Sequence, residues 1–135
     1  MASVVADTHT VIRYLDAPAR LSATATAQLD AAASTIGEYI YISAITLVEI
    51  RYLVEKNRID AAVLMTIEGE IAAPQPRLIA SALDSFVAAN LTHIPRSLVP
   101  DMPDRIIAAT AFHLGLPLIS RDSKIRSLTN IAVLW

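Results

Sequence analysis

Four carboxylates in this 135-residue chain occur where apolar stretches give way to polar ones. They are Asp7, Glu49, Asp104 and Asp122. Carboxylates that share one site repel one another and raise each other's pKa unless a cation lies among them. Oxygen ligands select hard divalent ions, and Mg²⁺ or Mn²⁺ held by a few acids with open water positions suits phosphate substrates. Such an ion can activate water and stabilise a leaving oxygen. If the fold gathers these acids, they predict hydrolysis of phosphodiester bonds.

The elements that must position the acids are predicted from the apolar pattern. Short β-branched runs predict strands, and the longer stretches between them have helical spacing. The expected strands are 3–6, 39–43, 91–94, 117–120 and 131–134, and the expected helices are 22–33, 43–57, 59–73, 76–90 and 103–114. Alternating strands and helices favour a parallel sheet covered on both faces. We therefore expect an α/β fold, a three-layer sandwich with a short parallel sheet of four to five strands flanked by helices.

Length and composition set the domain organisation. A chain of 135 residues with 54% hydrophobic residues predicts one domain over 1–135 with a well-filled core. Residues 60–90 supply two successive helices in this interpretation, so we expect a helical hairpin or arm there. The absence of cysteine agrees with a reducing, cytoplasmic location, and the apolar start, broken by Asp7, fits neither a signal peptide nor a membrane span.

The expected sheet brings the four acids together. Ligand sites of parallel sheets lie beyond the carboxyl ends of the strands. Asp7 and Asp122 each follow an expected strand, and Glu49 lies near the start of the helix after 39–43. Asp104 opens the helix that leads into 117–120, so a single crossover returns the start of that helix to the same edge. Convergence from four parts of the chain is stronger evidence than any one acid.

Each acid also has a purely structural interpretation. Asp is a preferred helix N-cap, which suffices for Asp7, and Asp101 can cap the helix that contains Asp104. Asp122 can be an ordinary turn residue. Glu49 fits a capping pattern begun by Thr46, but its neighbours are apolar, and an unpaired carboxylate beside a core is costly. Glu49 is thus the acid that most needs a compensating positive charge.

Four ordered motifs resemble those of PIN-domain nucleases, and most of all the VapC-type toxins of bacterial toxin–antitoxin pairs. They are VVADT at 4–8, SAITLVEI at 43–50, PDRIIAATA at 103–111 and LPLISRD at 116–122. The resemblance covers nearly the whole chain. It implies an Mg²⁺- or Mn²⁺-dependent endoribonuclease, a homodimer or a toxin–antitoxin hetero-oligomer, silenced by a small VapB-like antitoxin.

The resemblance also implies roles for single residues. Asp7, Glu49 and Asp104 match the principal metal ligands, and Asp122 matches a fourth acid that acts directly or through water. Three further residues match positions beside the acids: Thr8 and Ser120, whose hydroxyls hold carboxylates or water, or act as local caps, and the additional acid Asp101.

Basic residues near the acids can meet RNA phosphates or form a solvated face. Arg105 and Arg121 are the candidates for substrate binding, whereas Lys124 and Arg126 fit the solvated face better. A PIN-fold RNA-processing nuclease and a non-catalytic RNA- or protein-binding module remain open alternatives. An aspartyl phosphotransferase is less suitable, because that chemistry wants a second acid two residues after Asp7, where this chain has His9.

Overall fold

A computed structural model describes residues 2–135 and contains one five-stranded sheet in the order β3-β2-β1-β4-β5. All four strand pairings are parallel. The strands are β1 (Val4–Ala6), β2 (Ile40–Ser43), β3 (Leu78–Ser81), β4 (Leu118–Ile119) and β5 (Val133–Leu134). The parallel α/β architecture expected from the sequence is confirmed.

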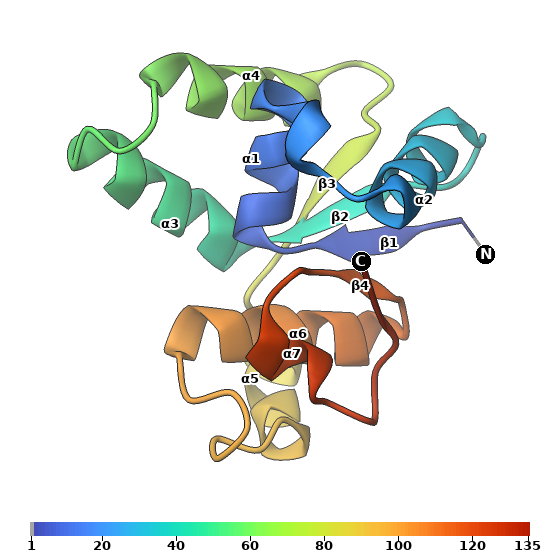
Figure 1. Ribbon diagram of the computed structural model, residues 1–135, viewed down its shortest axis with the longest axis vertical. Helices are drawn as coiled ribbons and strands as arrows, with labels where there is room; N and C mark the ends of the chain where they lie inside the picture. The colour runs from blue at the N-terminus through green and yellow to red at the C-terminus, as the bar shows by residue number, and fades with distance from the viewer. Residues whose placement is uncertain (1) are drawn as a thin grey trace.

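Seven α-helices and two short 3₁₀ helices connect the strands among the described residues. They are α1 (Thr8–Asp16), η1 (Pro18–Arg20), α2 (Ala23–Ser34), α3 (Ala44–Glu55), α4 (Ala61–Ala72), α5 (Ser85–Asn90), η2 (Leu91–His93), α6 (Met102–Leu114) and α7 (Ser123–Arg126). Figure 1 shows α1 to α4 on one side of the sheet and α5 to α7 on the other. The molecule is thus a three-layer sandwich.

The central strand explains why both faces need helices. β1 consists of three apolar residues, and side chains alternate between the faces of a strand. Val4 and Ala6 pack in the core under α1 to α4, whereas Val5 packs in the core on the α6 side. Because both faces of β1 are buried, its sequence is apolar throughout, as in other parallel sheets covered on both sides.

Helix boundaries follow the capping chemistry of the sequence. Ser22, Ser43 and Asp60 each accept a backbone hydrogen bond at the start of α2, α3 and α4. Gly115 ends α6 with a φ of 67°, a left-handed conformation that glycine adopts readily. The predicted N-caps of α2 and α3 and the stop at Gly115 are confirmed.

Two predictions about the middle of the chain are wrong. The stretch 76–90 is not one helix, because residues 78–81 form β3, which pairs with β2, and only Ser85–Asn90 is helical. Residues 91–94 are not a strand, since Leu91–His93 continues α5 as a 3₁₀ turn. Residues 60–90 therefore supply a helix, a sheet strand and a second helix, and they form no helical hairpin or arm.

The physical reason for the first error is tertiary. Residues 78–81 have modest strand preference, yet β2 would have an unpaired edge without them, and pairing satisfies its backbone groups. A separate finding concerns membranes: within residues 2–135, each helix is too short or too polar to cross one.

Candidate active site

The rim is the edge of the sheet at the carboxyl ends of the strands. Asp7 and Ser120 lie there, because they follow paired residues of β1 and β4. Ala6 lies opposite Ile119, and the next residue on each strand faces the same edge. The Ser120 hydroxyl donates to Asp7 Oδ2 at 2.5 Å, and both side chains are buried. Strand pairing therefore fixes the first carboxylate against a hydroxyl from a segment more than 100 residues away.

Asp7 performs the capping role and still contributes to the rim. Its Oδ1 accepts the backbone N–H of Thr10 at 2.9 Å, which caps α1. Its Oδ2 is held by Ser120 alone among the hydrogen-bond donors of the described residues. The capping and site interpretations of Asp7 are thus compatible, because they use different oxygens.

Glu49 accepts a hydrogen bond from Thr8 and does not take part in a helix cap. The Thr8 hydroxyl donates to Glu49 Oε1 at 2.6 Å and also lies 3.1 Å from the Thr46 hydroxyl. Thr46 is fully buried inside α3, whose N-cap is Ser43, so the capping pattern from Thr46 to Glu49 is not used. Burial raises the pKa of the half-buried Glu49 carboxyl, while the bond from Thr8 opposes that rise.

Asp104 is the most strongly perturbed acid at the rim. It lies in the first turn of α6, and Asp101 caps that helix by accepting the Asp104 N–H at 3.1 Å. Burial raises the pKa of Asp104 to about 7, and the negative charges of Asp101, Asp122, Glu49 and Asp7 add to the rise. This carboxyl is therefore about half protonated at neutral pH in the absence of a cation.

Asp122 joins the same group from the other side. Its Oδ1 accepts the N–H groups of Lys124 and Ile125 and so caps α7, while its own N–H donates to the Ser120 hydroxyl at 3.1 Å. Its charge is among those that raise the pKa of Asp104. Asp122 is thus both a helix cap and part of the electrostatic cluster.

The donor set suits a hard divalent cation. Carboxylate oxygens are the ligands that Mg²⁺ and Mn²⁺ prefer, and Asp104 and Glu49 carry raised pKa values that a cation would reverse. In the arrangement described for residues 2–135, no three acidic or histidine side chains are close enough to hold an ion together. The chemistry fits, and side-chain adjustment is needed to close the ligand set.

The basic candidates separate into two cases. The Arg105 guanidinium donates to the carbonyls of Ile94 and Leu91 at 2.7 and 2.8 Å, which braces the chain ahead of α6. Arg105 is thus tied to the main chain instead of extending toward a substrate. Arg121 is exposed and lines an open hollow at the rim.

Sequence reasoning missed Arg13, which lines the same hollow from α1. His9 and Arg13 are four residues apart on this helix and therefore share a face. That spacing, counted from Asp7 at the N-cap, is the signal that would have placed Arg13 beside the acids.

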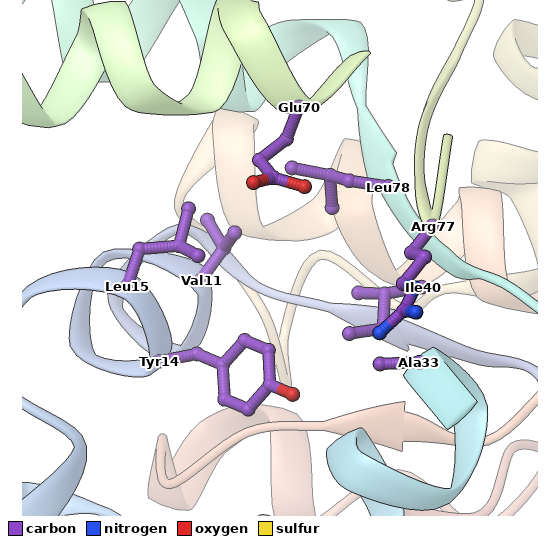
Figure 2. Close-up of a pocket in the computed structure, with 8 residues that line it drawn as sticks. All are labelled: Val11, Tyr14, Leu15, Ala33, Ile40, Glu70, Arg77 and Leu78. Carbon is purple, nitrogen blue, oxygen red and sulfur yellow. The ribbon is translucent and has the colours of Figure 1, made fainter. Parts of the chain in front are cut away.

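A second hollow lies at the opposite edge of the sheet. Figure 2 shows its lining of apolar side chains, with Glu70 and Arg77 among them. Ile40 and Leu78, the first residues of β2 and β3, contribute to it, so it lies away from the acids. Burial and Asp30, which accepts from the Tyr14 hydroxyl at 2.9 Å, raise the pKa of Tyr14 to about 12.

A parallel five-stranded sandwich with a rim of carboxylates defines a class of α/β proteins whose site lies beyond the strand ends. The PIN domain family matches residues 4–131, and the chain belongs to this family. The resemblance predicted from the four motifs is confirmed.

Individual relatives agree with this assignment. The chain is 29% identical over 127 residues to Ribonuclease VapC22 of Mycobacterium tuberculosis, covering 94% of this chain and 92% of that protein. It is thus a homologue of a VapC-family toxin.

Two solved structures share the fold. A VapBC2 structure from Rickettsia felis, bound to a DNA fragment from its promoter, gives a TM-score of 0.70 at 16% identity, covering 97% of this chain and 98% of that chain. A toxin–antitoxin complex from Klebsiella pneumoniae gives 0.67 at 20% identity, covering 98% and 97%.

Proposed function

We propose that this protein is a Mg²⁺- or Mn²⁺-dependent endoribonuclease and the toxin of a toxin–antitoxin pair. The observation that carries the proposal is the electrostatics of the rim: burial and four other acids raise the pKa of Asp104, whose carboxyl titrates at about 7. A site that gathers this much negative charge favours a divalent cation. The relative named as a ribonuclease supports RNA as the substrate.

The proposed roles follow from the contacts. Asp7, Glu49 and Asp104 hold the ion, and Asp122 contributes directly or through water. An ion held by these residues would supply a water of lowered pKa and positive charge for the leaving oxygen of the phosphodiester. Thr8 orients Glu49, and Ser120 orients Asp7, through the hydrogen bonds described above. Asp104 must release its proton before its carboxylate can bind the ion, which makes binding stronger as pH rises.

The proposed partners are a VapB-like antitoxin and a second copy of this chain. A chain of this fold occurs in a toxin–antitoxin complex, which supports the first. The chain also exposes large apolar side chains on α3, where Val48 and Tyr52 are 49% and 59% exposed. Residues four apart lie on one helix face, so these two form a continuous apolar surface suited to protein contact.

The test is cleavage of a mixed cellular RNA pool by the purified protein with Mg²⁺, with Mn²⁺ and with EDTA, beside Asp104→Asn. We expect discrete products from the native chain with metal, and none with EDTA or from the variant. Asp60→Asn is the matched control, because it makes the same change at an exposed helix cap outside the rim. Since Asn caps helices as well as Asp does, the control keeps full activity.

Two outcomes would contradict the proposal. Cleavage that survives both EDTA and Asp104→Asn would place the chemistry elsewhere. Failure of the native chain to cut, while Mg²⁺ still raises its melting temperature, would favour a metal-binding module without catalysis.

A further inference from the structure

The open hollow beside the rim combines opposite charges. It is lined by Asp7 and Asp122 from the acidic cluster and by Arg13 and Arg121, with His9 at the start of α1. The two arginines come from different elements, since Arg13 belongs to α1 and Arg121 to the segment between β4 and α7. Tertiary folding therefore places two guanidinium groups next to the proposed metal ligands.

Neither of these two arginines forms an ion pair or donates a side-chain hydrogen bond within the described residues. In residues 2–135 the one ion pair within 4.0 Å joins Arg51 to Glu68, at 3.6 Å. Neither Arg13 nor Arg121 donates a side-chain hydrogen bond to another described residue, in contrast to Arg105. Their donors remain available for a ligand in the hollow.

Arg13 is also held in place. Its guanidinium carbon lies 5.9 Å from the centre of the Trp135 ring, a cation–π arrangement. Its pKa is lowered by burial first and then by the positive charges of Arg20 and Arg121, and the opposing effect of Asp7 is the smallest of the four. The charge on Arg13 is therefore undercompensated, which favours an anion beside it.

We infer that this hollow is a binding site for a backbone phosphate of RNA, adjacent to the phosphodiester held at the carboxylates. Guanidinium groups present paired donors that match phosphate oxygens. The inference rests on the proposed function for its substrate, and it deepens that function by assigning Arg13 and Arg121 to the strand next to the cut.

The arrangement has a physical reason. Carboxylates alone repel RNA, and a bound divalent cation attracts the phosphate nearest to it. A neighbouring phosphate would still face the charges of Asp7 and Asp122 unless Arg13 and Arg121 offset them. The arginines thus allow consecutive phosphates of one strand to approach an acidic rim, and they favour one position of the strand over others.

The test measures binding of a fluorescein-labelled single-stranded RNA by anisotropy in EDTA, where cleavage is suppressed, from about 50 to about 200 mM salt. Removing one cation that neutralises a phosphate reduces the slope of log affinity against log salt by about 0.7 for single strands. We expect Arg13→Gln and Arg121→Gln each to reduce the slope by about that amount, and the double variant by about 1.4.

Matched controls separate this site from general charge and from folding. Arg58→Gln makes the same change at an exposed residue in the turn between α3 and α4, and should leave the slope unchanged. Arg13→Lys keeps the charge and should keep the slope while losing paired geometry. Melting temperatures identify any variant that has lost its fold, in which case Arg121→Gln alone decides, because Arg121 is exposed.

Cleavage kinetics give a second readout that a merely structural role would not move. With Mg²⁺ present, the double variant should raise KM about tenfold or more while kcat stays within about twofold, the pattern expected when uniform binding is removed. A fall in kcat at constant KM would overturn the assignment.

The outcomes also separate this inference from the proposed function. A native chain that cuts RNA, with a double variant of unchanged slope and KM, would overturn the phosphate site and leave the ribonuclease standing. A native chain that binds RNA through both arginines but never cuts it would overturn the ribonuclease and leave the phosphate site standing. The double variant is also tested against a polyglutamate peptide. If it loses binding to the peptide while its RNA binding is unchanged, the hollow receives an acidic protein segment and the inference is overturned.

Discussion

The two edges of the sheet hold carboxylates in opposite electrostatic states. At the edge where the strands begin, Glu38 accepts the N–H of Ser3 at 3.0 Å and also its hydroxyl, and these bonds lower the pKa of Glu38. At the edge where the strands end, burial and four neighbouring acids raise the pKa of Asp104 to about 7. Hydrogen-bond donors contact the Glu38 carboxylate, whereas other negatively charged carboxylates lie near Asp104.

We interpret this difference as a division between an edge that stabilises the fold and an edge that carries the proposed site. Ser3 binds both Glu38 and the backbone N–H of Tyr39, so it ties β1 to the chain entering β2. The rim instead retains repulsion that the fold itself does not relieve. A protein keeps such a site when a ligand supplies the missing positive charge.

The largest expected effect is seen when the same isosteric change is compared at the two edges of the sheet. Asp7→Asn should reduce RNA cleavage by about 100-fold or more, the scale on which loss of one electrostatic stabiliser acts. The fold should persist, because the Asn oxygen still accepts from Thr10 and caps the helix, while its NH2 group can donate to the Ser120 hydroxyl oxygen in place of the bond that Asp7 accepts. Glu38→Gln should leave cleavage unchanged. Equal activity of the two variants in a cleavage assay would remove the distinction between the edges.

The next effect concerns the hydroxyl that holds Glu49. Thr8→Val removes the donor that opposes the raised pKa of Glu49, so the metal concentration for half-maximal cleavage should rise about 10- to 100-fold. Thr110→Val is the matched control, because Thr110 is also buried and its hydroxyl bonds only to Ile106 of its own helix. A metal titration in which both variants behave alike would show that Thr8 has no positioning role.

A third effect is the pH dependence of stability. An unfolded aspartate has a pKa of about 3.9, whereas Asp104 titrates at about 7 in the fold. Between these values the folded chain binds a proton that the unfolded chain has released, so stability falls as pH rises through this window. In EDTA, Asp104→Asn should have a flatter profile and a higher melting temperature than the native chain at pH 8.

Metal addition sharpens that experiment. At pH 8 (about one unit above the pKa of Asp104), Mg²⁺ should raise the melting temperature of the native chain and have much less effect on Asp104→Asn. Parallel profiles for both proteins, with and without Mg²⁺, would show that Asp104 carries no stored repulsion.

The smallest expected effect is at the opposite edge. Ser3→Ala removes the hydroxyl contacts to Glu38 and Tyr39, so the melting temperature should fall by a few degrees, with cleavage unchanged. Because the pKa of Glu38 is lowered in the fold, its carboxylate contributes to folding stability above about pH 4.3, the ordinary glutamate pKa. That contribution to stability is lost as the pH falls through the lowered pKa of the folded state. Calorimetry at pH 3 and pH 7 would reveal a smaller difference between variant and native chain at the lower pH.

Local chemistry made much of this predictable. The N-caps Ser22 and Ser43, the stop at Gly115 and the apolar β1 depend on residues that are close in sequence, and the structure places them as expected. The rim was also predictable, because strand ends and helix starts in a parallel fold meet at one edge. The approximate positions of the acids thus followed from the order of elements.

Other features depended on partners distant in sequence. Residues 78–81 became a strand because β2 offered an unpaired edge, and their own composition of Leu, Ile, Ala and Ser favours a helix as readily. Residues 91–94 needed no sheet partner, because the Arg105 side chain satisfies the carbonyls of Leu91 and Ile94. Neither contact leaves a periodic signal in the sequence.

Residue types, local spacing and chain order were enough to predict the family and the parallel α/β architecture, both of which are confirmed, and to nominate the set of acids. Which hydroxyl holds which acid, and which arginines share a hollow, emerged only on folding: Thr8 pairs with Glu49, Ser120 pairs with Asp7, and Arg13 lies with Arg121. Hydrogen bonds and charge interactions act over a few ångströms in space, whereas these partners are separated along the chain by distances that the fold alone brings together. No local pattern therefore encodes these long-range pairings.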